Sequence, residues 1–461
     1  MTTSPSAKGV AARQLAVEVL AKVETEKSFA KLALSAAFDK KNLSERDRAF
    51  ATALVQGVLR HREELDQAIK SLSSQPLNKM PAKLKNNLRV AIFQLRYMTD
   101  IPSSAVLNTA TEIGKKTGHV GIGKFVSGVL RAYTRKAEGE PTEPRELSER
   151  FSLPQWLIDR WFARYGEEET IRLLEYSQSV PQLTVRACET GITPEALLNV
   201  FTGSGITCHP GELVDACLIV EDRGKHKGPI EKLPGYNEGL FIVQDEAAAF
   251  VSKVVDAKPG EQIVDLCAAP GGKTINIAEA MENKGKVVAV DVQQGRLELL
   301  KRTRQRIGLT NIEIVTADGT TYAPERKVDR VLVDAPCMGT GVINRRSDLR
   351  FQRNEPDIAA LVELQRKLME SAAEMLKEGG VLVYSTCSLE PEENEENLKW
   401  FLEKHPEFEA VSIAQYVPEK ILNMDREAFE RGWIQLRPTK HGVSGFFIAK
   451  LQKSPLADHD V

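Results

Sequence analysis

Apolar residues recur at helical spacing through the first third of the chain. In the stretch ARQLAVEVLAKVE, Leu15 and Val19 lie one turn apart, and the same spacing returns in LKNNLRVAIFQLRYM and FVSGVLRAY. Ser44 stands directly before another such run, where its side chain can cap the first turn of a helix. Because residues 12–135 show no β-type alternation, we predict an all-α domain over residues 1–140.

The pattern changes after this domain. Residues 137–150 are polar and rich in Pro and Glu, which is typical of a linker, and LPQWLIDRWFARYGEEETIRLLEYSQ then predicts amphipathic helices. Between residues 183 and 244, short apolar runs such as LTVRAC and ACLIV are separated by Gly and Pro, with one helical stretch among them. We therefore predict linker helices and a small α+β module over residues 141–240.

Strand-like and helical runs alternate in the rest of the chain. QIVDLCAA, KVVAVDV, IEIVTAD, VDRVLVDAP and GGVLVYSTC are separated by amphipathic stretches, as in βαβ units. Gly379-Gly380 follows the helical run LVELQRKLMESAAEMLKE and predicts its C-cap. We expect a Rossmann-like α/β domain with a mostly parallel sheet over residues 241–461.

Composition narrows the class of protein. No apolar run of the 461 residues approaches the roughly 18–20 residues of a membrane span, and the N-terminus lacks an apolar signal core. The six cysteines form no CxxC pair, so neither a disulfide framework nor a zinc site is indicated, and reduced thiols in the cytoplasm fit best. We expect no metal and no membrane partner.

The charge is distributed unevenly along the chain. The net charge is −2, but residues 1–140 carry 23 basic and 13 acidic residues, a local net of +10. A basic helical domain attached to an acidic body indicates a module that faces nucleic acid. A solvated basic surface explains the same count equally well.

Two cysteines follow predicted strands fifty positions apart. Cys337 lies in DAPCMGTGV after VDRVLV, and Cys387 lies in VYSTCSLEPEENE after GGVLVY. The carboxyl ends of parallel strands meet at one edge of a sheet, where ligands bind in open α/β folds. A pair of thiols there suggests covalent catalysis, and the spacing leaves open which sulfur attacks.

A glycine-rich turn and a set of acids occupy the same predicted edge. The turn DLCAAPGGKT runs from Asp265 to Thr274, and Asp291, Asp318 and Asp334 follow the next strands. Small residues let a ligand approach the backbone, and a carboxylate at Asp291 can accept hydrogen bonds from ribose hydroxyls. The chain has neither GxGxxG nor a P-loop, so the pattern indicates a nucleoside rather than a pyrophosphate.

Together the motifs DLCAAPGGKT, DAPCMGTGV and YSTCSLEPEENE resemble the S-adenosylmethionine-dependent RNA (cytosine-C5)-methyltransferases of the RsmB/NOP family, over roughly residues 240–452. Within it, the bacterial 16S rRNA enzymes carry a domain similar to the antitermination factor NusB before the catalytic part, as residues 12–135 would here. This resemblance implies a class I methyltransferase domain, 16S rRNA as partner and S-adenosylmethionine as methyl donor. We expect a monomer.

The resemblance also assigns roles to residues. It implies that Cys387 attacks the base, that Cys337 assists product release, and that Asp334 holds the ring at N3 and N4. Two alternatives stay open, a transfer-RNA cytosine-C5 methyltransferase and a non-catalytic RNA-binding factor of the antitermination type. The residues implied in binding S-adenosylmethionine are Cys267, Ala268, Ala269, Pro270, Gly271, Gly272, Lys273, Asp291, Asp318 and Asp334.

For other polar residues near these motifs, a structural interpretation competes with a functional one. Arg345, Arg346 and Arg350 could hold RNA phosphate or form a basic loop. The acidic run 392–396 is expected to be a solvated helix start, and His441 is expected to be polar surface.

Overall fold

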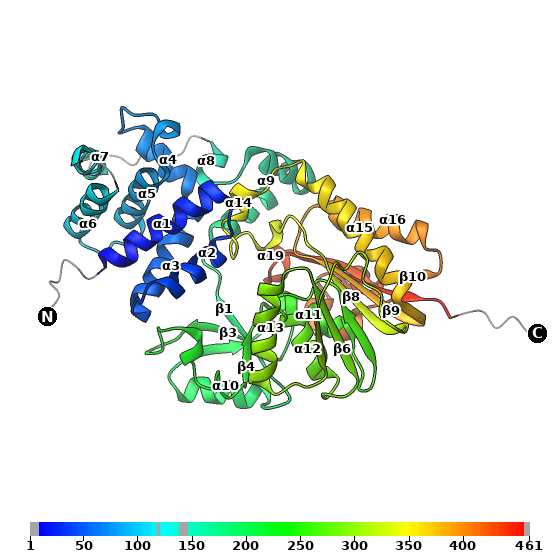
Figure 1. The fold of residues 1–461 in the computed structure, drawn as a ribbon. Helices are drawn as coiled ribbons and strands as arrows, with labels where there is room; N and C mark the ends of the chain where they lie inside the picture. The colour runs from blue at the N-terminus through cyan, green and yellow to red at the C-terminus, as the bar shows by residue number, and fades with distance from the viewer. Residues whose placement is uncertain (1–8, 118–119, 138–145, 456–461) are drawn as a thin grey trace, which may run out of the picture. The chain divides into compact units, whose positions relative to one another are not determined.

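The structure is a computed structural model and describes residues 9–117, 120–137 and 146–455. The chain divides into two compact units, which are described separately. The helical unit contains residues 1–180 together with 343–353, and the catalytic-motif unit contains residues 181–342 and 354–461 (Figure 1). Most of the predicted linker, residues 138–145, lies outside the described residues.

Helices of the first unit bury their apolar faces in one core. Leu15 and Leu20 of α1 are almost completely buried, and the Ser44 side chain accepts a hydrogen bond from Asp47 N–H at the start of α3, as predicted. The helices are α1 (Val10–Glu26), α2 (Ala30–Lys40), α3 (Glu45–Arg60), α4 (Arg62–Lys70), η1 (Leu77–Lys79), α5 (Ala82–Tyr97), α6 (Ser103–Lys116), α7 (Val120–Ala137), α8 (Leu147–Phe151), α9 (Gln155–Gln178) and α14 (Leu349–Gln352).

Residues 343–353 come from the middle of the catalytic motifs but pack within the helical unit. The Asp348 carboxylate accepts a hydrogen bond from Ala30 N–H at 2.9 Å, so a residue 318 positions away serves the first turn of α2. Arg60 donates to the Asn344 carbonyl at 3.2 Å. This segment is therefore part of the helical core, a role that its sequence did not predict.

Arg350 of this segment is 2% exposed. Its guanidinium donates to the carbonyl of Phe151 at 2.6 Å and to that of Ser177. Burial, and then the charge of Arg60, lowers the pKa of Arg350 to about 9. The interpretation of Arg350 as a phosphate ligand is wrong, because its donors are directed to backbone carbonyls.

The second unit begins with a small antiparallel sheet, in agreement with the predicted α+β module. Its strand order is β2-β3-β1-β4, and α10 packs on it. A buried ion pair between Arg186 of β1 and Glu279 of α12 fixes this sheet to the part of the unit that follows. The elements are β1 (Leu183–Ala187), α10 (Pro194–Gly203), β2 (Thr207–Pro210), β3 (Cys217–Asp222), η2 (Ile230–Lys232) and β4 (Phe241–Val243).

The larger sheet has the order β10-β12-β9-β8-β5-β6-β7, with β11 paired to β12. Strands β5 to β9 are parallel, and β12 runs antiparallel to β9. The elements are α11 (Glu246–Val255), β5 (Gln262–Asp265), α12 (Gly272–Ala280), β6 (Lys286–Asp291), α13 (Gln294–Ile307), β7 (Ile312–Thr316), β8 (Val328–Asp334), η3 (Thr340–Val342), α15 (Asp357–Met375), β9 (Leu376–Thr386), η4 (Pro391–Glu393), α16 (Glu395–Lys404), β10 (Phe408–Ala410), η5 (Ala414–Tyr416), α17 (Glu419–Leu422), α18 (Arg426–Glu430), β11 (Trp433–Leu436), α19 (Pro438–His441) and β12 (Phe446–Lys453).

Helices cover both faces of this sheet (Figure 1). Alternate strand residues such as Leu332 and Val383 pack with α11, α12 and α13, whereas Val331 and Leu382 pack with α15 and α16. Burial on both faces explains why the strands are continuous apolar runs. None of the described helices is long and apolar enough to cross a membrane.

One predicted boundary is wrong. α15 ends at Met375 and β9 begins at Leu376, so Gly379 and Gly380 lie within the strand rather than at the helix C-cap. Gly379 has φ of +74°, and the pairing of β8 with β9 shifts register there. The glycines accommodate an irregularity of the strand, which a helix-ending pattern resembles in sequence.

Candidate active site at the carboxyl edge of the sheet

The two motif cysteines lie side by side. β8 and β9 are neighbouring parallel strands with Asp334 opposite Ser385, so the loops that follow leave the sheet at the same level. The sulfur atoms of Cys337 and Cys387 are 3.2 Å apart, close enough for one thiol to donate a hydrogen bond to the other. Cys337 is 8% exposed, whereas Cys387 is half-buried.

Glycines bring the two loops into contact. Gly341 N–H donates to the Cys387 carbonyl at 3.0 Å, and Gly445 N–H donates to the Gly341 carbonyl at 2.9 Å. A Cβ at Gly341 would lie 2.2 Å from the Gly445 carbonyl oxygen, so no larger residue fits without backbone movement. The GTG sequence after Cys337 therefore holds the loop of one thiol against the other.

The environment keeps Cys337 protonated. The hydrogen bond with Cys387, followed by burial, raises the pKa of the Cys337 thiol well above its usual range. A thiol of this kind is a poor nucleophile, but once its proton is removed it is a strong base.

Asp334 and Lys273 form an ion pair beside the thiols. Lys273 Nζ lies 2.7 Å from Asp334 Oδ2, and Asp334 Oδ1 accepts from the Ser385 hydroxyl at 2.9 Å. Burial alone would lower the pKa of Lys273, but the charge and hydrogen bond of Asp334, with a further contribution from Cys387, raise it. The ammonium group is therefore a fixed positive charge within electrostatic range of Cys387.

The glycine-rich turn joins β5 to the first turn of α12. Gly271 has φ of +106°, and a Cβ there would meet the Leu300 side chain, so glycine suits this position on both counts. The buried Asp265 carboxylate accepts from the Thr274 hydroxyl at 2.7 Å. Burial raises the pKa of Asp265 to about 7.

Acids follow the next two strands. Asp291 accepts from the N–H groups of Ala269, at 3.0 Å, and Gln293, at 2.8 Å, which ties the end of β6 to the glycine-rich turn. Asp318 after β7 is largely exposed and accepts from Thr320. Two oxygens on each carboxylate leave capacity for hydroxyl or amino donors of a ligand.

These side chains and N–H groups match the hydrogen-bonding groups of S-adenosylmethionine. α12 begins without a side-chain cap, so its first N–H groups are available to an anion such as an amino-acid carboxylate. Asp291 suits ribose hydroxyls, and Asp318 suits the exocyclic amine of a base. Among the described residues, no group of three or more metal-ligating side chains occurs.

Two residues that sequence reasoning missed support the Cys337 loop. Glu393 is fully buried and accepts from Met338 N–H at 3.0 Å, and Gln365 of α15 donates to Glu393 at 2.8 Å. The interpretation of residues 392–396 as a solvated helix start is therefore wrong for Glu393. Pro391, which begins the short turn η4, is the local sequence feature that accompanies the buried position of Glu393.

His441 also differs from expectation. It is 3% exposed, accepts from Arg437 N–H and lies 3.0 Å from Asp425, so it is a buried structural residue rather than polar surface.

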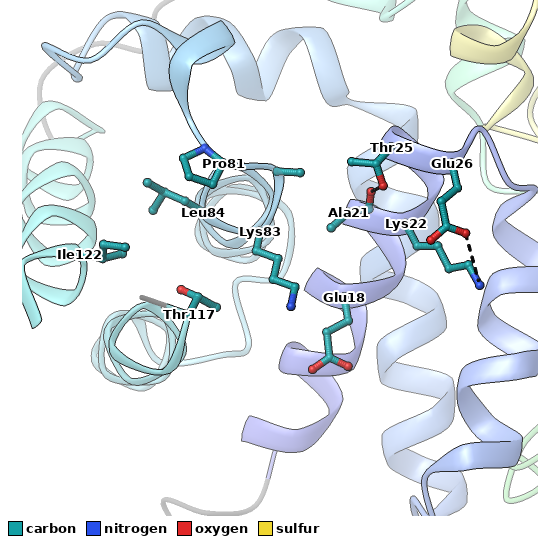
Figure 2. A pocket seen from close by; sticks show the side chains of 11 residues that line it. Glu18, Ala21, Lys22, Thr25, Glu26, Pro81, Lys83, Leu84, Thr117 and Ile122 are labelled. Carbon is teal, nitrogen blue, oxygen red and sulfur yellow. Dashed lines mark hydrogen bonds and ion pairs between the residues drawn. The ribbon is translucent and has the colours of Figure 1, made fainter. Parts of the chain in front are cut away.

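The helical unit contains a cavity of about 380 Å³ between α1 and the helices α5, α6 and α7 (Figure 2). Lys83 and Glu18 point toward it, whereas the Lys22 side chain turns to Glu26, with which it is paired at 3.5 Å. Acidic and basic side chains both line this cavity, and its lining residues form no recognisable catalytic pair.

Comparisons with known proteins agree with this architecture. The family described as 16S rRNA methyltransferase RsmB/F matches residues 252–452, the NusB family matches residues 10–135, and a ferredoxin-like domain of RsmF/B-like methyltransferases matches residues 153–226. These matches confirm the predicted fold class of each part.

Relatives match nearly the whole chain. A probable ribosomal RNA small subunit methyltransferase B of Synechocystis sp. is 36% identical over 96% of this chain and its own full length, and that of Bacillus subtilis is 35% identical over 97% of this chain and 99% of its own. The crystal structure of PH0851 has a TM-score of 0.79 and 31% identity, covering 96% of this chain and 99% of its own. A methyltransferase homologue from Pyrococcus horikoshii has a TM-score of 0.56 and 30% identity, over 67% and 97%.

Proposed function

Because this chain belongs to the 16S rRNA methyltransferase RsmB/F family, we propose that it transfers a methyl group from S-adenosylmethionine to C5 of a cytosine in 16S rRNA. The observation that carries the proposal is the thiol pair, 3.2 Å apart, beside the Asp334 carboxylate. Residues 1–140 and 141–240 would grip the RNA, residues 241–461 would catalyse the reaction, and the site of action would be the cytoplasm.

Attack on the ring begins with Cys387. C5 of cytosine is a weak nucleophile, and a bond from the Cys387 sulfur to C6 turns the ring into an enamine whose C5 is electron-rich. The Lys273 ammonium favours the thiolate form that makes this bond. Asp334 would hold a proton against N3 and accept from the N4 amino group, which stabilises the charge that develops on the ring.

Resolution of the adduct uses Cys337. S-adenosylmethionine, when bound, supplies the methyl group to C5. Once the Cys387 sulfur is bonded to C6, it no longer raises the pKa of Cys337, and Cys337 gives its proton to solvent. The Cys337 thiolate then removes the C5 proton, the C5–C6 double bond re-forms, and the electrons of the C6–S bond return to Cys387. Cys337 ends as a thiol and Cys387 as a thiolate, as each began, and one proton has been released to solvent for each methyl group transferred.

RNA must present its base to this edge of the sheet. A stacked cytosine is inaccessible to a thiol at a protein surface, so the target would turn out of its stack, at least cost from a loop. The net charge of +10 in residues 1–140 supports contact with phosphates.

Two variants test the division of labour between the thiols. Cys387→Ala should abolish methyl transfer, because the sulfur that forms the bond to C6 is removed. Cys337→Ala should form a protein–RNA adduct that survives denaturant, because attack proceeds while elimination fails. The measurements are mass spectrometry of 5-methylcytosine and gel analysis of the adduct with 16S rRNA.

Three outcomes would contradict the proposal. An active Cys387→Ala variant that forms the adduct would reverse the roles. Methylation of transfer RNA but not 16S rRNA would replace the substrate. Absence of S-adenosylmethionine binding by the purified protein would favour a non-catalytic RNA-binding factor.

A further inference from the structure

The Cys337 loop is held by a carboxylate that is enclosed in protein. Glu393 ends the short turn η4 and is 0% exposed. Its two oxygens lie 3.0 and 3.2 Å from Met338 N, so the N–H immediately after Cys337 is shared between them. Among the described residues, no lysine, arginine or histidine pairs with Glu393.

Gln365 completes the arrangement from a different element. Its Nε2 donates both to Glu393 at 2.8 Å and to the Pro336 carbonyl at 2.9 Å, and its Oε1 accepts from Asn397 of α16. The carbonyl before Cys337 and the N–H after it are thus both bound by one side-chain pair. The two peptide groups that flank the thiol cannot rotate without breaking these bonds.

A carboxylate is a costly choice for this position. Burial without a cation disfavours the charged form and raises the pKa of Glu393 to about 7. Serving Met338 N–H alone would need only a neutral acceptor. Glu393 instead receives two donors on Oε1, Met338 N–H at 3.0 Å and Gln365 Nε2 at 2.8 Å, and its Oε2 lies a further 3.2 Å from Met338 N.

We propose that Glu393, acting with Gln365, is a positioning residue that keeps the Cys337 sulfur in place for product release. The inference rests on the proposed function. Both side chains bind the Pro336 and Met338 peptide groups rather than a sulfur, and the charge of Glu393 in addition raises the pKa of Cys337. Gln365→Ala, which keeps that charge, separates positioning from electrostatics. Because attack by Cys387 does not require Cys337, loosening the loop should slow release and spare attack.

The test compares adduct formation with adduct release in single turnovers on 16S rRNA. In Glu393→Ala the denaturant-resistant adduct should persist about 10–100-fold longer than in the unchanged protein, since displacement of a catalytic group by about 1 Å costs up to about 10²-fold. Its rate of formation and the KM for RNA should change by less than about threefold. Glu393→Gln, which retains one acceptor, should show a smaller delay of the same kind.

Matched variants separate this role from a general structural one. Glu396→Gln removes an exposed carboxylate three residues away and should leave both rates unchanged. Gln365→Ala removes the Pro336 anchor and should reproduce the release defect, so the inference stays testable if Glu393→Ala fails to fold. Release and formation slowed equally, or unchanged release in Glu393→Gln and Gln365→Ala, would overturn it.

Failure of the inference can be told from failure of the proposed function. If Cys337→Ala traps the adduct and Cys387→Ala forms none, the chemistry stands, and normal release in the Glu393 and Gln365 variants rejects only the positioning role. If Cys337→Ala traps no adduct, the covalent mechanism itself is rejected.

Discussion

Two ion pairs, one in each unit, join their partners at nearly the same distance but in different surroundings. In the helical unit, Arg89 binds Asp66 through two nitrogens at 2.6 Å and Glu24 through a third at 2.9 Å, with 2% of its side chain exposed. At the sheet edge, Lys273 lies 2.7 Å from Asp334, and their side chains are 13% and 27% exposed.

The difference lies in unused hydrogen-bonding capacity. Arg89 also donates to Asn86, so its fork of donors is directed wholly into the protein. Among the described residues, Lys273 has one hydrogen-bond partner, Asp334, for its three N–H donors. The first pair therefore fixes a core, whereas the second retains donors and acceptors for a ligand.

Arg89→Met has the largest expected effect and tests the buried ion pair of the helical unit. Asp66 would remain buried without its partner, which costs about 3–5 kcal/mol of unfolding free energy. Denaturant unfolding measures this loss, and methyl transfer per folded molecule should be unchanged. The double variant Arg89→Met/Asp66→Leu should recover much of the stability, and failure to do so would mean that the pair is not the cause.

Lys273→Met tests the ion pair at the sheet edge. Loss of the positive charge near Cys387 and Asp334 should reduce kcat/KM for methyl transfer by about 10²–10³-fold, the effect typical of removing one stabilising donor. Asp334 keeps Ser385 and partial exposure, so the thermal midpoint should stay close to that of the unchanged protein. A large loss of stability with normal activity would place Lys273 with Arg89 as a structural residue.

A change of pH should alter the stability of one unit and not of the other, with a smaller effect than either substitution. Burial raises the pKa of Asp265 to about 7, so its contribution to stability is full below pH about 4 and is lost as pH rises through 7, on the order of 4 kcal/mol in all and about 2–3 kcal/mol above pH 5. Burial alone would raise the pKa of Glu24, but Arg89 and Lys85 lower it, so its contribution is constant above pH about 5. Denaturant unfolding from pH 5 to 8, with Asp265→Asn as the control that removes the slope, measures this; an unchanged slope in that variant would contradict it.

The sequence predicted those features that depend on periodicity or local chemistry. Parallel strands end at one edge, so apolar runs before Cys337 and Cys387 were enough to expect the two thiols together. Ser44 was recognisable as a helix cap because its partner is three residues away.

Features that depend on distant partners were not predictable. Glu393 lies in a run of glutamates, and nothing in that run marks the one whose partner, Gln365, is 28 positions earlier. Arg350 follows two other arginines and resembles a solvated basic loop, because the carbonyls that bind it belong to residues more than 170 positions away. Composition describes the charge of a segment and not the direction in which each side chain points.

The packing of residues 343–353 in the helical unit has a consequence for synthesis on the ribosome. Residues 1–180 are translated first, but α2 lacks its Asp348 cap and Arg60 lacks the Asn344 carbonyl until residue 353 has emerged. At roughly 5–20 residues per second, this delay lasts on the order of 10–30 s. The first unit to be made is thus completed only after the Cys337 motif has been translated.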